Sequence, residues 1–102
     1  MLILPIKKKW FDMIKSGEKK EEYREIKPYY TSRFNNMRDP DADMKVTDNG
    51  VSFLITFKNG YRKDSPTIIC RCFLRTGTGK EEWGAEPNKE YYILDILEVC
   101  KW

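Results

Sequence analysis

Residues 2–24 decide the fold, and they read LILPIKKKWFDMIKSGEKKEEYR. The first part of this stretch, Leu2–Ile6, is an almost wholly apolar run, which predicts a short buried strand. The pattern then changes to helical period, with apolar side chains on one stripe, and this predicts an amphipathic helix over residues 7–16. Gly17 stands at the position of a helix C-cap glycine, so the chain is expected to reverse direction there.

The segment after this glycine is unusually rich in charge for a strand. Residues 19–26 read KKEEYREI, and the alternation of a strand places Glu22 and Arg24 on one face. Strands carry few charges unless one face lines a wet cavity or lies at an edge of the sheet. The segment therefore gives the first indication of a functional site.

The rest of the chain indicates three further strands and one further helix. Alternating apolar residues favour the strands, while Asp, Asn and Gly favour the loops. The predicted elements are a helix at 28–34, a loop at 35–50, a strand at 51–58, a strand at 67–75, a loop at 76–88 and a strand at 91–99. About five to six strands with two short helices predict an α+β fold with a small, mixed β-barrel as its sheet. The 102 residues fit one domain, 1–102.

Charge and composition exclude several classes of function. The net charge is only +3, from 19 basic and 16 acidic residues, which favours a local site over a basic surface for duplex nucleic acid. The sequence contains no histidine, which excludes Ser-His-Asp triads, Cys-His pairs and histidine metal sites. The odd number of cysteines, Cys70, Cys72 and Cys100, favours reduced thiols over a disulfide framework or a zinc site. We expect no metal and no cofactor.

The protein is expected to be cytoplasmic. No segment approaches the ~20 apolar residues that are needed to cross a bilayer, so we expect no membrane partner. The apolar run near the N-terminus is too short for a signal peptide, and its charges follow it instead of preceding it.

The charged segment contains the pattern G-x-K-x-x-E-x-R, formed by Gly17, Lys19, Glu22 and Arg24. With the predicted strand and helix before it, this pattern resembles the ASCH domain family, whose fold is a PUA-like β-barrel. The stretch KEEWGAEP at residues 80–87 is also similar to small bacterial and phage-borne ASCH proteins. The resemblance covers nearly the whole chain, most specifically residues 2–34 and 79–97.

The four residues of the pattern also have a direct physical interpretation. Gly17 permits a sharp turn from helix to strand. Lys19 and Arg24 supply positive charge and Glu22 a carboxylate, and such groups in one cleft can clamp a phosphate and bind a base edge. The alternative is a surface ion-pair ladder, in which the three charges neutralise one another on an exposed strand.

Aromatic residues beside charged ones are the second feature that indicates a binding site. Tyr61 precedes two basic residues after an Asn-Gly turn, and Trp83 lies near Glu86. Such aromatics can stack on a nucleobase, although ordinary packing is the alternative for both. The predicted ligand-binding set is Gly17, Lys19, Glu22, Arg24, Tyr61, Trp83 and Glu86.

These residues lead to an expectation of RNA or modified-nucleoside binding, since the resemblance associates ASCH domains with RNA. The resemblance also implies an enzymatic alternative. Some small ASCH proteins are amidohydrolases that deacetylate N4-acetylcytidine with the lysine of the pattern, a threonine three residues later as nucleophile, and a distant glutamate. Lys19 matches the lysine, but Glu22 occupies the threonine position. An enzyme would then use Lys19 and Glu22 as catalytic residues, with Glu22 acting as a base on water. A third interpretation is a phage or mobile-element protein that binds a host protein.

Overall fold

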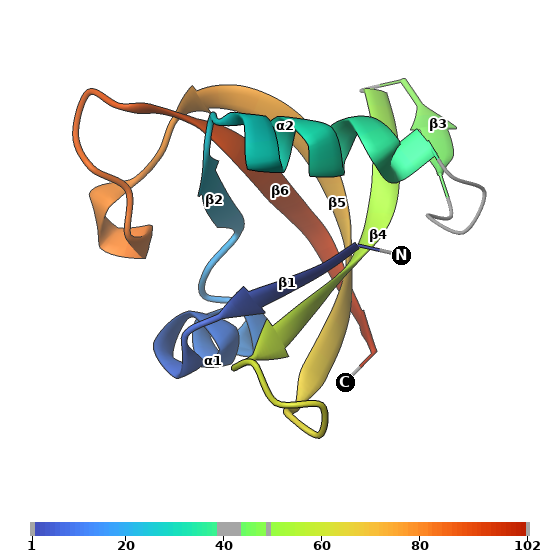
Figure 1. The fold of residues 1–102 in the computed structure, drawn as a ribbon, viewed down its shortest axis with the longest axis vertical. Coiled ribbons are helices and arrows are strands. Elements are labelled where there is room, and N and C mark those ends of the chain that lie inside the picture. Colours follow the sequence, from blue (N-terminus) through green and yellow to red (C-terminus); the bar gives the residue numbers. More distant parts are fainter. Residues whose placement is uncertain (1, 39–43, 49, 102) are drawn as a thin grey trace.

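The computed structural model describes residues 2–38, 44–48 and 50–101. Figure 1 shows two helices lying against one strongly curled sheet. In chain order the elements are β1 (Leu2–Ile6), α1 (Lys8–Ser16), β2 (Glu21–Glu25), α2 (Pro28–Asn35), η1 (Asn36–Arg38), β3 (Lys45–Thr47), β4 (Gly50–Asn59), β5 (Thr67–Thr78), η3 (Glu81–Trp83) and β6 (Glu90–Lys101). In the described part of the chain, no helix is long and apolar enough to cross a membrane.

The sheet is mixed and curls into a half-barrel. Within the described residues it has six strands in the order β1-β4-β5-β6-β2, with β3 added to β4. The β1–β4 pair is parallel and the other pairs are antiparallel. The predicted α+β fold with a small mixed barrel-like sheet and two short helices is therefore confirmed. The backbone ladder stops at β1 and β2, which are the two edges of the curl.

The turn from α1 into β2 follows the predicted cap. Gly17 adopts a left-handed conformation, with φ of 86°, and its N–H donates to the carbonyl of Ile14. Only glycine takes this conformation without strain, so the cap fixes where the helix ends. The N–H of Lys19 then donates to the carbonyl of Met13 at 2.9 Å, which draws the chain back over the end of the helix. This local geometry sets where Lys19 enters the molecule.

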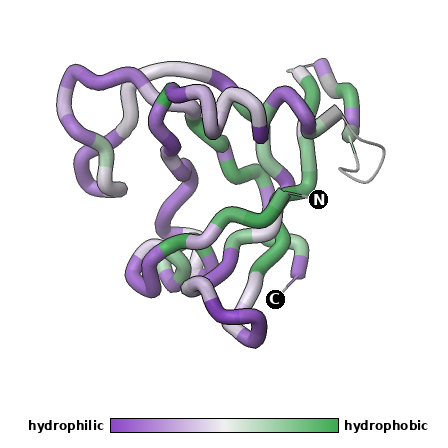
Figure 2. The backbone as a smooth tube through the Cα atoms, in the orientation of Figure 1, coloured by the Kyte–Doolittle hydropathy of each residue, from purple (hydrophilic) through white to green (hydrophobic). Residues whose placement is uncertain are grey.

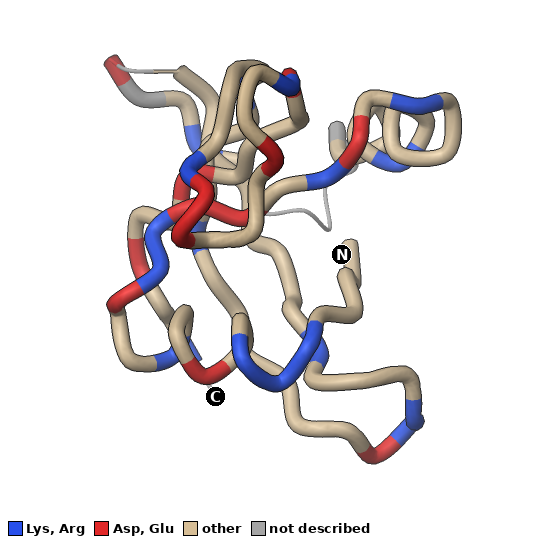
Figure 3. Tube along the Cα trace, turned by 90° about the vertical axis from the view of Figure 1, so that its left-hand side faces the viewer, with Lys and Arg blue, Asp and Glu red and all other residues tan. Residues whose placement is uncertain are grey.

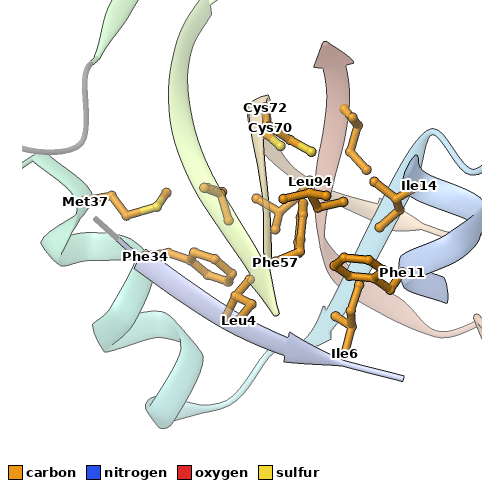
Figure 4. Close-up of a cluster of buried hydrophobic side chains, with 13 residues drawn as sticks. Leu4, Ile6, Phe11, Ile14, Phe34, Met37, Phe57, Cys70, Cys72 and Leu94 are labelled. Carbon is orange, nitrogen blue, oxygen red and sulfur yellow. The ribbon is translucent and has the colours of Figure 1, made fainter. Parts of the chain in front are cut away.

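The core lies inside the curl of the sheet, where both helices contribute side chains to it (Figure 4). Phe11 and Ile14 of α1 enter from one end and Phe34 of α2 from the other. On β5, Cys70 and Cys72 face this core and are fully buried as free thiols. Figure 2 shows hydrophobic backbone along β1 and hydrophilic backbone along β2 and the outer loops. Burial of this apolar surface is the main stabilising term of the fold.

Several boundaries differ from the predictions; β6, for example, runs to Lys101 instead of residue 99. The short strand β3 lies inside the expected loop 35–50, of which residues 39–43 and 49 are outside the described part. β5 continues to Thr78, into the expected loop 76–88, because its last residues pair with the start of β6. β2 begins at Glu21, two residues later than predicted. For β3 and β5, the long-range pairing of strands overrides the local composition.

Candidate functional site

A cleft of about 590 Å³ opens between the two unpaired edges of the half-barrel. Its walls are the junction of β1 and α1, the strand β2, the turn between β4 and β5, and the loop before β6. Small-molecule sites in proteins have volumes of about 300–1,000 Å³, so the cleft can hold one group the size of a nucleotide. The G-x-K-x-x-E-x-R segment, predicted to line a wet cavity, lies at this cleft.

Glu22 is the centre of the floor of the cleft. Its Oε1 atom accepts from Nζ of Lys19 at 2.8 Å and from the backbone N–H of Tyr23 at 3.2 Å. Its Oε2 atom lies 3.3 Å from Nη1 of Arg24. One carboxylate between two cations leaves the group of three with a net charge of +1. Only 4% of Glu22 is exposed, so the ion-pair ladder on a solvated surface is wrong.

Lys19 is fully buried beneath the cleft, with 0% of the residue exposed. Besides Glu22, its ammonium donates to the backbone carbonyl of Trp83 at 3.0 Å. It also lies 4.9 Å from the ring centre of Trp10 and 5.0 Å from that of Tyr23, and such rings attract a cation. Burial lowers the pKa of Lys19, while the Glu22 carboxylate acts in the opposite direction. The side chain therefore supports the floor from below and has no surface in the cleft.

Arg24 connects the two edges of the sheet. From β2, its Nη2 atom donates to the carbonyl of Pro5 in β1 at 3.0 Å, and Nη1 donates to its neighbour's carbonyl, that of Tyr23, at 2.7 Å. The guanidinium also lies 5.9 Å from the ring centre of Tyr30. In a closed barrel, backbone hydrogen bonds would join β1 to β2. Here the Arg24 side chain makes the hydrogen bond between these two strands. It lines the cleft and keeps further N–H groups for a ligand.

Tyrosine hydroxyls fix the loop that covers one side of the cleft. The hydroxyl of Tyr23 accepts from the backbone N–H of Lys80 at 2.9 Å and donates to Glu21 at 2.8 Å. The hydroxyl of Tyr91 accepts from the backbone N–H of Glu86 at 3.0 Å. Burial is the main cause that raises the pKa of Tyr23, so this hydroxyl remains a donor over the whole physiological range.

Three of the four remaining predicted residues line the same cleft. Tyr61 of the β4–β5 turn, Trp83 and Glu86 all line it, and 90% of Tyr61 is exposed. Nζ of Lys80 lies 4.6 Å from the ring centre of Trp83. The role of Gly17 is purely conformational, because it makes the turn after α1 but does not line the cleft.

Sequence reasoning missed several aromatic side chains that line the cleft. Trp10 belongs to the apolar side chains of α1, but it is only partly buried and its ring packs against Gly84. Tyr30 and Tyr91 also line the cleft, although they come from a helix and a strand. Helical and strand periodicity indicate only that these rings face inward. Trp10 shares the apolar stripe of α1 with the buried Phe11 and Ile14, so the sequence held no signal that sets it apart from them.

The charges around the cleft are unequal. Five lining residues are cationic, namely Lys7, Lys8, Arg24, Lys27 and Lys89, whereas three are carboxylates, namely Glu22, Glu25 and Glu86. The buried Lys19 adds a further positive charge below the floor. The cleft is therefore suited to an anionic or polar ligand with a flat aromatic part.

Outside this cleft, the described residues offer fewer ionisable side chains for a ligand. A hollow of about 660 Å³ runs along α2, with Lys27 as the one ionisable side chain that lines it. No group of three His, Cys, Asp or Glu side chains in the described part is placed to hold a metal ion. Comparisons with protein-family models, curated proteins and solved structures found no match.

Proposed function

We propose that this protein is a binding module for a nucleobase, presented in single-stranded RNA or as a modified nucleoside. The observation that carries the proposal is the buried Lys19–Glu22–Arg24 group at the floor of an aromatic-lined cleft. Rigid hydrogen-bonding groups beside aromatic faces are the usual means by which proteins recognise unpaired bases. The resemblance of the G-x-K-x-x-E-x-R segment to ASCH domains agrees with this proposal.

Glu22 and Arg24 supply the polar part of the recognition. A carboxylate has about four acceptor positions. Three of those of Glu22 face Lys19, the backbone N–H of Tyr23 and the guanidinium of Arg24. The remaining position suits one N–H donor, such as an amino or imino group of a base. Arg24 beside it donates to a carbonyl or ring nitrogen. Donor and acceptor next to each other match the Watson–Crick edge of a base.

The aromatic side chains supply the stacking part. Trp83, Tyr30 and Tyr91 line the cleft around the Glu22–Arg24 pair. Stacking on an aromatic ring contributes about 1–3 kcal/mol per base and tolerates any base. Specificity then depends on the two polar groups, and affinity depends on the rings and the cationic surroundings.

Hydrolysis of an acylated nucleoside is the alternative, and one observation favours it. Burial lowers the pKa of Lys19, which brings this amine closer to the neutral form that acts as a base. However, Lys19 has no surface in the cleft, and its ammonium is held by Glu22 and the Trp83 carbonyl. Glu22 also has most of its acceptor positions filled. Recognition needs no rearrangement of these groups, whereas proton transfer does.

The binding proposal is tested by titrating ¹⁵N-labelled protein with AMP, CMP, GMP, UMP and N4-acetylcytidine, followed by two-dimensional NMR. We expect saturable shifts of the indole N–H signals of Trp10 and Trp83 and of the amides of β2. Glu22→Gln should weaken binding by tenfold or more, taking about 1.4 kcal/mol as the least that a charge-assisted hydrogen bond contributes. The matched control is Glu90→Gln, which changes an exposed carboxylate outside the cleft. Shifts scattered over the surface, without saturation, would contradict the proposal.

The hydrolytic alternative has its own test. Purified protein is incubated with N4-acetylcytidine, and free cytidine and acetate are measured by chromatography. Turnover that disappears in Lys19→Ala and in Glu22→Gln would establish an enzyme. Saturable binding of the nucleoside with no release of acetate would leave recognition as the function.

A further inference from the structure

The exposed tyrosine at the rim of the cleft has no structural task in the described part of the molecule. Tyr61 lies in the turn between β4 and β5, and 90% of it is exposed although it lines the cleft. Among the described residues it has no ring, cation or hydrogen-bond partner, in contrast to Tyr23, Tyr30 and Tyr91. A ring that is exposed at the edge of a site is available to stack on a ligand.

Positive charge continues from the cleft along the same side. Lys7 and Lys8, at the junction of β1 and α1, are exposed and line the cleft, although Lys8 also pairs with Asp12 at 2.6 Å. Arg62 and Lys63 follow Tyr61 directly and are exposed. Figure 3 shows a cationic stretch of chain where β1 leads into α1, and further cationic chain on the turn between β4 and β5. Asp64 is the acidic residue of this turn.

The opposite side of the cleft has a different character. There the loop before β6 contributes Glu86 and Lys89, and β2 contributes Glu25, with Lys89 near both carboxylates. Charges of that side largely neutralise one another. The cleft is therefore asymmetric, with net positive charge and an open aromatic ring on one side only.

From this asymmetry we infer that the ligand is a single strand of nucleic acid that leaves the cleft over Tyr61, with its phosphates beside the lysines of the β1–α1 junction. The inference rests on the proposed function, and it selects a strand over a free nucleoside. A free nucleoside carries no phosphate and would leave the cationic rim and Tyr61 without a task. A neighbouring nucleotide brings both a second base for Tyr61 and phosphates for the lysines. Bases in a duplex are already stacked and paired, so they cannot use either group in this way.

The test compares mononucleotides with short strands. Affinities of AMP, CMP and UMP are measured by competition against a fluorescein-labelled pentanucleotide, and those of the pentaribonucleotides A5, C5 and U5 by fluorescence anisotropy. We expect at least one pentanucleotide to bind about tenfold or more tightly than its own monophosphate, because it adds stacking and phosphate contacts. The DNA pentanucleotides of the same sequences show whether the 2′-hydroxyl matters.

Variants at the rim locate the strand. Tyr61→Ala should lower the affinity of the pentanucleotide about 5- to 150-fold, the range for loss of one stacked base, and should lower the affinity of the monophosphate by much less. The matched control is Tyr29→Ala, since Tyr29 is an exposed tyrosine on α2 outside the cleft. This control should leave both affinities as they are.

The lysines are tested through the salt dependence of binding. For single strands the slope of log K against log salt is about −0.7 for each phosphate contact. The double variant Lys7→Ala, Lys8→Ala should therefore flatten the slope for the pentanucleotide by about 0.7–1.4. The double variant Lys45→Ala, Lys101→Ala removes two exposed lysines outside the cleft and should leave the slope unchanged.

The outcomes separate this inference from the proposed function. Equal affinity for monophosphate and pentanucleotide, with no effect of Tyr61→Ala, would overturn the strand and leave the nucleobase site in place. Binding of neither ligand would overturn the proposed function itself. Loss of pentanucleotide binding alone in Tyr61→Ala, with folded protein by circular dichroism, would support the strand.

Discussion

Nζ of Lys19 lies 2.8 Å from Oε1 of Glu22, in an ion pair whose side chains are 0% and 6% exposed. Removing one partner of such a pair leaves a buried charge with fewer opposite charges around it, and this is strongly destabilising. The pair also connects distant parts of the chain, because Lys19 donates to the carbonyl of Trp83 as well. The stability of the fold and the shape of the cleft therefore depend on the same ammonium group.

Lys19→Met is expected to lower the free energy of unfolding by about 3 kcal/mol, the lower end of the range for breaking a buried pair, since Arg24 remains beside Glu22. The measurement is urea unfolding at pH 7. Lys8→Met is the control, because Lys8 forms an exposed ion pair with Asp12 and should cost less than about 1 kcal/mol. An equal loss of unfolding free energy in both variants would contradict the idea that burial makes the Lys19–Glu22 pair important for stability.

Arg24→Met is expected to loosen the edge strand β1. The variant removes the hydrogen bond from Arg24 to the Pro5 carbonyl, which links β2 to β1. Hydrogen–deuterium exchange measured by mass spectrometry should become faster in the peptide that contains residues 2–6, while β5 remains protected. Arg33→Met, on the exposed face of α2, is the matched variant and should leave this peptide unchanged. The idea fails if β1 exchanges at the same rate in both.

Gly79→Ala is expected to detach the loop that carries Trp83. A Cβ atom at this position would lie 2.6 Å from two ring atoms of Tyr23 and 2.7 Å from Cβ of Ala85. Tyr23 is held by two hydrogen bonds and cannot move aside. We therefore expect the free energy of unfolding to fall by about 1–3 kcal/mol. Gly77→Ala serves as the comparison, because its nearest neighbour is the end of the flexible Arg75 side chain. Thermal unfolding of both variants would show whether the difference exists.

The buried thiols should resist alkylation. Burial raises the pKa of Cys70 to about 12 and raises that of Cys72 as well, and the thiolate is the form that reacts. Iodoacetamide at pH 8 should therefore label the folded protein once, at the exposed Cys100, and three times in urea. Mass spectrometry of tryptic peptides gives the positions. Rapid labelling of Cys70 in the folded protein would show that the core opens.

The same thiols should make stability fall above pH 9. The unfolded chain loses thiol protons near pH 9, while the folded chain keeps them, so the folded state binds more protons there. Stability is then full below pH 9 and decreases as the pH rises toward the folded pKa. Cys72→Ala removes one such group and should make the fall between pH 9 and 10 shallower by about 1 kcal/mol per pH unit. An unchanged slope in urea unfolding would contradict this origin.

Local sequence signals predicted most of the elements correctly. The apolar run at Leu2–Ile6, the helical stripe of α1 and the alternation of β5 are short-range patterns, and each lies where it was expected. The loop at 35–50 was only partly correct, since β3 forms within it. A three-residue strand exists because it pairs with β4, and pairing with a distant segment leaves no local pattern.

For the candidate site, the sequence by itself determined which residues share a face. Gly17 fixes the turn, and strand alternation puts Glu22 and Arg24 on one side, because both effects act within a few residues of chain. Only the tertiary structure decided that Lys19 is fully buried. Its ammonium meets the Trp83 carbonyl from 64 residues further along the chain, and no local period specifies what covers a face. The open gap between β1 and β2, which Arg24 bridges, was likewise decided by how the whole sheet curls.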